Sequence, residues 1–295
     1  MFQKYFKPGD VDEALAILAE YGGKARVLAG GTDLVLQLKK EELAVEAVVD
    51  ITGIAELRFI REENDEIKIG ALATHSDLSS SPLLRLKAPF LAEAAESVGS
   101  LQIRNVGTIG GNIVNAQPAA DTAIPLLALD ALATVASPEG IRQLPVAELY
   151  LPGGGSAVDP SREIVLSFSF NPPGNAGGAG SFGRVARRKA LCLPVFNMAV
   201  VLFPDALKEK IAGARLAMGP VAPVPLRARK AEKILLEGVP GDKVYREAAQ
   251  AAAAEAAPRD SLFRGSSWYR KKLAGAVIYR HLKLAAALIF APAAS

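Results

Sequence analysis

The chain of 295 residues contains a single cysteine, Cys192, and this limits both its architecture and its chemistry. One cysteine cannot form a disulfide within the chain, so the fold must be stabilised by packing. An iron–sulfur cluster normally needs four thiolates, and a structural zinc ion needs several Cys or His ligands. Only two histidines are present, His75 and His281. Any redox chemistry must therefore use an organic cofactor or a metal that a partner chain holds.

The composition is that of a globular protein, and a prior of roughly 100–200 residues per domain predicts about two domains. Half of the residues are apolar, which is enough to form buried cores. The net charge is only +3, with Lys and Arg interspersed among Asp and Glu. This mild balance is compatible with an anionic ligand or an acidic partner, and it gives no indication of nucleic-acid binding.

Two observations bear on location. The N-terminal sequence lacks the apolar run and the cleavage site of a signal peptide. The longest apolar stretch, residues 284–291, is shorter than the roughly 20 residues that a helix needs to span a bilayer. We therefore expect a cytoplasmic protein with no membrane span.

Hydrophobic patterning divides the chain into three parts. Residues 1–55 alternate short helical and extended patterns, which predicts a small α/β unit. Residues 56–175 contain several strand and helix patterns and end in a Gly/Pro-rich stretch, 171–180, typical of a linker or loop. Residues 176–295 begin with strands and end in helices, the last over 267–290, which predicts a separate α+β domain.

Several element predictions in the second part depend on local spacing. Alternating patterns predict strands over 57–60 and 66–70. Apolar residues at helical spacing predict helices over 76–86 and 90–98, and a further helix near Asp121.

Two adjacent glycine pairs stand out, in Leu28–Leu34 (LAGGTDL) and in Thr108–Asn112 (TIGGN). Glycine permits a turn with positive φ and a close approach to a ligand. Consecutive free N–H groups in such a turn bind anions, and the hydroxyls of Thr32 and Thr108 could add donors. Either pair, taken alone, is better explained as a tight strand–helix turn than as a phosphate site. Neither loop has the G-x-G-x-x-G or the Walker pattern of other nucleotide sites.

These segments resemble one known family. AGGTDL and the long run QIRNVGTIGGNIVNAQPAADTAIPLLALDA resemble the FAD-binding subunit of the xanthine dehydrogenase and carbon monoxide dehydrogenase family. Further stretches agree in the family's order: IGALATHSDL, SFGRVARRK, LAMGPVAPVPLRARKAE and SSWYRKKLAGAVIYR. The resemblance implies a vanillyl-alcohol-oxidase type FAD-binding fold, of class α+β. Its two α/β subdomains would be residues 1–55 and 56–175, and its C-terminal α+β domain residues 176–295.

The resemblance also implies the residues that contact FAD. Asp33 has an alternative role, because a carboxylate repels phosphate and could instead cap the helix that follows it. Asp121 matches the family's aspartate near the ribityl and ring end of the flavin, and it too could instead cap the next helix. No catalytic residue and no metal ligand is implied in this chain. The implied contacts are Arg26, Val27, Leu28, Ala29, Gly30, Gly31, Thr32, Asp33 and Leu34 in the first loop, Thr108, Ile109, Gly110, Gly111 and Asn112 in the second, and Asp121, Val165 and Gly183.

The function that the resemblance implies is electron transfer. A large partner subunit would hold the molybdenum cofactor, a small one two [2Fe-2S] clusters, and this chain would pass electrons through FAD to NAD, a quinone, ferredoxin or oxygen. A dimer of heterotrimers is the family's common assembly. A stand-alone FAD-dependent oxidoreductase of the same fold and a cofactor-free scaffold subunit remain as alternatives. The chain departs from many relatives at Gln117-Pro118, at Val98 and in RRKALCLP at 187–194, which leaves the acceptor open.

The remaining candidates have plainer interpretations. We expect His75 to pack or form hydrogen bonds, His281 to lie on the surface and Cys192 to be a small buried side chain. Trp268 and Tyr269 are expected to pack the last helix. The basic residues Arg184, Arg187, Arg188 and Lys189 could meet an acidic partner, the flavin or only water.

Overall fold

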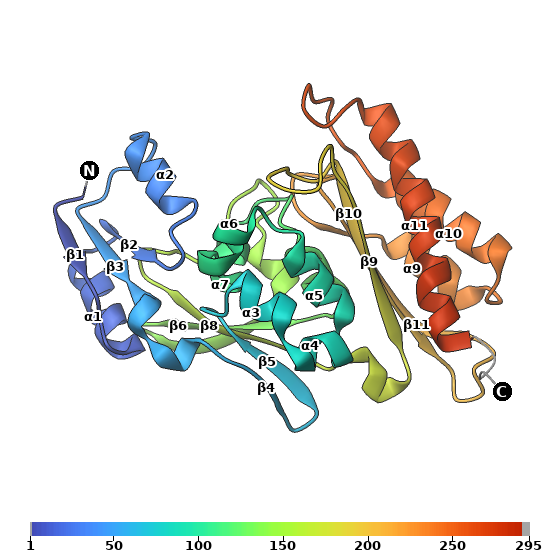
Figure 1. Cartoon of the computed structure of the whole chain (residues 1–295), viewed down its shortest axis with the longest axis horizontal. Helices are drawn as coiled ribbons and strands as arrows, with labels where there is room; N and C mark the ends of the chain where they lie inside the picture. The colour runs from blue at the N-terminus through green and yellow to red at the C-terminus, as the bar shows by residue number, and fades with distance from the viewer. Residues whose placement is uncertain (1, 291–295) are drawn as a thin grey trace.

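The computed structural model describes residues 2–290, and its first 50 residues form a small parallel sheet at one end of the molecule (Figure 1). The strand order is β1-β3-β2. Asp10 begins α1, because its carboxylate accepts a hydrogen bond from the Glu13 N–H at 2.8 Å. Ala14 and Leu18 of this helix are buried in the core beside the sheet. The elements are β1 (Lys4–Phe6), α1 (Val11–Glu20), β2 (Ala25–Leu28), α2 (Leu34–Lys39) and β3 (Ala47–Asp50).

The middle of the chain forms a five-stranded antiparallel sheet of order β4-β5-β8-β6-β7. Six short helices lie between β5 and β6 in the sequence (Figure 1), and all of them except α6 share one core with the sheet. The strands are β4 (Ile60–Glu63), β5 (Glu66–Gly70), β6 (Leu132–Ser137), β7 (Gly140–Pro145) and β8 (Ile164–Phe170). The helices are α3 (His75–Ser80), α4 (Pro82–Lys87), α5 (Pro89–Glu96), α6 (Leu101–Val106), α7 (Ile109–Val114) and α8 (Ala123–Ala128).

The C-terminal part is a four-stranded antiparallel sheet of order β12-β11-β10-β9 with helices on one side. The central strand β10 is buried on both faces, which explains its uninterrupted apolar sequence. Ala199 and Val201 belong to the core shared with the middle part, whereas Met198 and Val200 belong to the core under α11. The elements are β9 (Ala179–Val185), β10 (Phe196–Pro204), β11 (Ile211–Gly219), β12 (Leu226–Arg227), α9 (Arg229–Glu237), α10 (Asp242–Glu255) and α11 (Ser267–Phe290).

The middle part differs locally from the sequence predictions. The strand predicted over 57–60 is a 3₁₀ turn, Ala55–Leu57, followed by β4. The helix predicted over 76–86 is interrupted at Ser81, whose hydroxyl caps α4 by accepting from the Leu84 N–H. A proline disfavours the helical conformation at the residue before it. Ser81 is accordingly extended, and Pro82 begins the separate helix α4. Helices α6 and α7 and strand β7 were not predicted.

Helix α11 bears on two expectations, one about membrane spans and one about Trp268 and Tyr269. Among the described residues it is the one helix that is long and apolar enough, by length and composition alone, to cross a membrane, although its continuous apolar run is short. Core helices of globular proteins meet the same criterion, and α11 buries Ala274, Ile278 and Leu282 against the C-terminal sheet. Trp268 and Tyr269 are 65% and 47% exposed, so neither is buried in the core under this helix.

Arg270 fixes the start of α11 instead. Its buried guanidinium donates hydrogen bonds to three backbone carbonyls, those of Val195, Arg259 and Pro220. Residues 1 and 291–295 of the predicted first and third domains lie outside the described residues.

Candidate functional site

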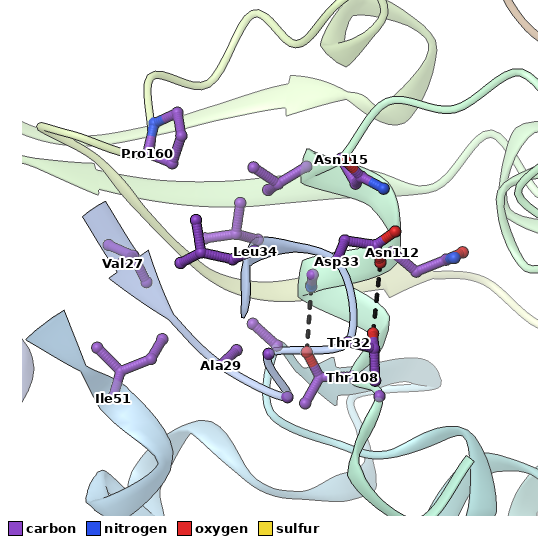
Figure 2. A pocket seen from close by; sticks show the side chains of 18 of the residues that line it. Val27, Ala29, Thr32, Asp33, Leu34, Ile51, Thr108, Asn112, Asn115 and Pro160 are labelled. Atoms are coloured by element: carbon purple, nitrogen blue, oxygen red, sulfur yellow. Dashed lines mark hydrogen bonds between the residues drawn. The ribbon is translucent and has the colours of Figure 1, made fainter. Parts of the chain in front are cut away.

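A cavity of about 540 Å³ lies between the first parallel sheet and the middle part of the molecule. This volume is within the roughly 300–1,000 Å³ of ordinary ligand sites. Figure 2 shows its two main walls: the loop after β2, with Thr32, Asp33 and Leu34, and the start of α7, with Thr108 and Asn112. A third wall, residues 156–165, contributes Pro160.

Most of the residues implied by the resemblance line this cavity. Leu28 instead turns into a small core with Leu38 and Val48, and Ile109 is fully buried in the middle core. The implied residues that line the cavity are Arg26, Val27, Ala29, Gly30, Gly31, Thr32, Asp33, Leu34, Thr108, Gly110, Gly111, Asn112 and Val165.

Asp121 lies outside the cavity lining, in a buried polar cluster between α8 and the C-terminal sheet. Both of its oxygens lie 3.1 Å from Nε of Arg184, and Nδ2 of Asn197 donates to Oδ1 at 2.8 Å. Burial raises the pKa of Asp121, while the neighbouring Arg184 acts to lower it. The alternative expectation of a helix cap is wrong, because Thr122 is the N-cap residue of α8 and makes no side-chain capping bond.

Gly183 also lies outside the cavity lining, on the face of β9 that packs against α11. A Cβ atom at this position would lie 2.6 Å from the ring of His281. His281 is therefore not a surface residue as expected. Its Nδ1 lies 2.7 Å from the Ser181 hydroxyl, and burial lowers its pKa. Cys192 is partly exposed rather than buried.

The first glycine loop presents a run of free donors. The backbone N–H groups of residues 30–33 have no acceptor among the described residues. Gly31 has φ +69°, a conformation that side chains disfavour. Gly30 packs against the residues that lead into the second loop so closely that a Cβ atom would lie 2.0 Å from the Val106 carbonyl oxygen. This loop therefore offers neutral N–H groups to an anion, as a phosphate nest does.

The N–H groups of the second glycine loop are already hydrogen-bonded to other groups of the protein. Ile109 and Gly110 donate to the carbonyls of Ala73 and Ala71, and Gly111 donates to the Thr108 hydroxyl oxygen at 3.1 Å. This loop thus contributes side chains rather than backbone donors, and the Thr108 O–H remains available to donate. Asn112 can donate as well, because its Oδ1 is occupied by the Thr122 hydroxyl at 2.7 Å.

The capping role expected for Asp33 is wrong. Asp33 occupies the N-cap position of α2, but its side chain makes no capping hydrogen bond. It accepts instead from the Thr32 hydroxyl at 3.3 Å, at the cavity wall (Figure 2).

Two contributors to the site were not predicted from the sequence. Segment 156–165, of which the resemblance implied only Val165, joins the first sheet because the Val27 N–H donates to the Pro160 carbonyl at 3.0 Å, and no local motif predicts this contact. His75 lines the cavity but is only 2% exposed, and burial with nearby Arg104 lowers its pKa to about 4. The one signal in the sequence that could have pointed to His75 was that the chain has only two histidines.

The cavity's chemistry defines a class of protein. Apart from Arg26, whose guanidinium donates to the Gly23 and Ala25 carbonyls, its donors are neutral backbone N–H groups, hydroxyls and amides, which suit the shared negative charge of a diphosphate. Within residues 2–290, no three His, Cys, Asp or Glu side chains come together to hold a metal ion. The fold and the cavity therefore define a protein that binds a nucleotide cofactor, and the residues present fit FAD.

Comparisons with known proteins give the family. Residues 1–171 match the family described as FAD binding domain in molybdopterin dehydrogenase, and residues 182–285 match the CO dehydrogenase flavoprotein C-terminal domain. The carbon monoxide dehydrogenase medium chain of Hydrogenophaga pseudoflava is 33% identical over 282 residues, 96% of each chain. The putative xanthine dehydrogenase FAD-binding subunit of Escherichia coli is 32% identical over 92% of each chain.

A solved structure agrees. The carbon monoxide dehydrogenase of Hydrogenophaga pseudoflava that lacks the Mo-pyranopterin moiety superimposes with a TM-score of 0.91 at 32% identity, over 98% of this chain and 99% of that one. This chain belongs to the FAD-binding flavoprotein subunits of the molybdenum hydroxylases and is a component of an oxidoreductase. The predicted α+β FAD-binding fold is confirmed.

Proposed function

We propose that this chain is the electron-transfer subunit of a heteromeric molybdenum hydroxylase. It receives electrons from the [2Fe-2S] clusters of a small partner and passes them through FAD to an acceptor, while a large partner holds the molybdenum cofactor. The observation that carries this proposal is the match of both parts of the chain to flavoprotein subunits over nearly their whole length. The single cysteine supports it, because this chain cannot supply the cluster ligands itself.

Within this function, the first loop holds the diphosphate. The free N–H groups of residues 30–33 donate to phosphate oxygens, and Thr108 and Asn112 add side-chain donors from the opposite wall. When bound, FAD supplies the electron exchange, and the chain supplies position and exclusion of water. Val165 lines the wall beyond these loops. Asp121 and Gly183 contribute indirectly, through the packing of the C-terminal sheet on the middle part.

The assembly follows from the same proposal. The chain acts in the cytoplasm, in a dimer of heterotrimers with one large and one small partner subunit. Residues 1–55 and 56–175 form the two FAD-binding subdomains, and residues 176–295 form the C-terminal domain.

The first experiment is an absorption spectrum of the purified chain, followed by chromatographic identification of the released cofactor. We expect about one FAD per chain, as for a dedicated cofactor site. Gly174→Ala is the matched control for glycine variants of the loops, because no atom lies within 4 Å of its Cβ position. A protein that takes up no FAD, even when its partner subunits are present, would refute the proposal.

The electron-transfer step needs the assembled complex. Substrate added to the holoenzyme without acceptor should bleach the flavin absorption, and a complex rebuilt without this chain should lose transfer to the acceptor while its clusters still become reduced. Unchanged transfer without this chain would favour a scaffold role.

A further inference from the structure

His75 is held rigidly beneath the second glycine loop. Its backbone N–H donates to the Gly107 carbonyl at 3.0 Å, and the preceding Thr74 forms an isolated β-bridge with Thr108. Thr74 and Asp77 cap α3 reciprocally, and Arg58 pairs with Asp77 at 3.0 Å. The backbone of His75 is therefore held in place by contacts with the same residues that form the second loop.

One edge of this imidazole is closed off by protein. Nδ1 of His75 is fully buried and has no hydrogen-bond partner among the described residues. An orphaned buried N–H is rarer in proteins than an under-satisfied acceptor, so Nδ1 carries the lone pair. The ring is neutral near pH 7, because burial first, and the charge of Arg104 second, lower its pKa to about 4. A neutral imidazole without a proton on Nδ1 carries it on Nε2.

The other edge of the ring lies at the cavity. Gly107 lies beside this edge, because a Cβ atom built on it would lie 3.3 Å from Cδ2 and 3.8 Å from Nε2. Both His75 and Gly107 line the cavity. A side chain at position 107 would therefore stand against the Cδ2–Nε2 edge, and glycine leaves that edge open.

We propose that His75 binds the cofactor directly, donating a hydrogen bond from Nε2–H to an acceptor atom of FAD. The inference rests on the proposed function only in requiring that FAD occupies this cavity. It assigns to His75 a role that packing alone does not need, since an apolar ring would fill the same space without leaving Nδ1 unpartnered. Neutral His75 supplies a donor that adds no charge to the site.

Affinity measurements on the purified chain test the proposal. His75→Phe keeps a ring in the site and removes the donor, so the dissociation constant for FAD should rise about tenfold, as for the loss of one buried hydrogen bond. His75→Gln places an amide donor near the former Nε2 and should stay within about threefold of wild type. The unfolding temperature of the FAD-free His75→Phe chain should be unchanged or raised, since an unpartnered polar atom is gone.

A spectroscopic measurement on the unmutated protein does not depend on whether a variant folds. With only two histidines, ¹⁵N-labelled histidine gives two imidazole patterns, and His281→Gln identifies the other one. We expect the Nε2–H tautomer for His75, with signals that shift on FAD addition, while the signals of His281 stay in place.

The outcomes separate this inference from the proposed function. A wild-type chain that takes up no FAD contradicts the function itself. A chain that binds FAD, with His75→Phe binding equally well, or with His75→Gln losing as much affinity as His75→Phe, overturns the role of His75 alone. An Nδ1–H tautomer, or His75 signals that do not move at saturating FAD, would overturn it too.

Discussion

The two glycine loops look alike in sequence and act differently in the structure. Both place adjacent glycines where one wall of the cavity forms, at residues 30–31 and 110–111. In the first loop the N–H groups of residues 30–33 are free, whereas in the second each N–H from residue 109 to 112 already has an acceptor. The same pair of residues thus exposes the backbone in one place and allows close packing in the other.

The difference comes from what lies behind each loop. The second loop is bonded to residues 71–75, and a Cβ atom at Gly110 would lie 2.8 Å from both Cβ and O of Ala71. The first loop contacts the second through Gly30 and continues into α2. The second loop is therefore held by its neighbours, and we propose that the first, with its free N–H groups, is the ligand-binding element.

The largest expected effect, on both stability and FAD affinity, comes from a substitution that forces the two loops apart. Gly30→Ala places a Cβ atom 2.0 Å from a backbone carbonyl oxygen of Val106, and neither backbone can yield without moving a whole loop. We expect the unfolding free energy to fall by about 3 kcal/mol, as in severe overpacking, and FAD affinity to fall at least about a hundredfold. Urea denaturation and FAD titration measure both, with Gly174→Ala as control. Near wild-type values would mean that the loops are not in contact.

Lowering the pH should destabilise the protein through His75, which lies beneath the second loop. The pKa of His75 falls from 6.5 to about 4 on folding, so between these pH values the unfolded chain binds a proton that the folded chain does not, and stability falls as the pH drops from 6.5 toward 4. A shift of this size corresponds to up to about 3 kcal/mol. Urea denaturation between pH 7 and 4.5 should therefore show a steeper loss of stability in wild type than in His75→Phe. Parallel pH profiles would show that His75 is not buried as described.

A matched pair of substitutions compares the loops directly. Gly31→Ala forces an alanine into φ +69°, which costs about 1–2 kcal/mol and reorients free N–H groups, so FAD affinity should fall about tenfold. Gly111 lies within α7, where alanine gains helix propensity but comes 3.1 Å from the Thr108 hydroxyl. Its substitution should change affinity less than about threefold. Equal losses in both variants would contradict the division of labour between the loops.

Much of the fold was predictable because its longer elements carry strong local patterns. The last helix was predicted with the bounds 267–290 that the structure shows, and strand 66–70 was predicted with its observed limits. The short helices α6 and α7 were missed because six residues hold too little periodicity to stand out from a loop. Strand β7 was missed because most of its residues are exposed on a hairpin, so no alternation marks it.

The site was predictable only where residue type fixes backbone conformation. Glycine pairs mark tight turns, so residue types and motif resemblance were enough to bring both loops together, and the structure shows that both line one cavity. Which loop has free N–H groups depends on partners such as Ala71 and Ala73, which are distant in sequence from the loop that they bind. The same holds for segment 156–165, which reaches the cavity through the Pro160 carbonyl.

The sequence by itself determined that this chain has no internal disulfide and cannot ligate its own iron–sulfur cluster, and its motifs placed it in a flavoprotein family. Composition and local pattern suffice for those conclusions. The tertiary structure alone decided that Asp121 pairs with Arg184 instead of capping a helix, and that His75 is a buried neutral ring at the cavity. Burial and charge pairing are set by elements far apart in the chain, and these two properties govern what an ionisable side chain can do.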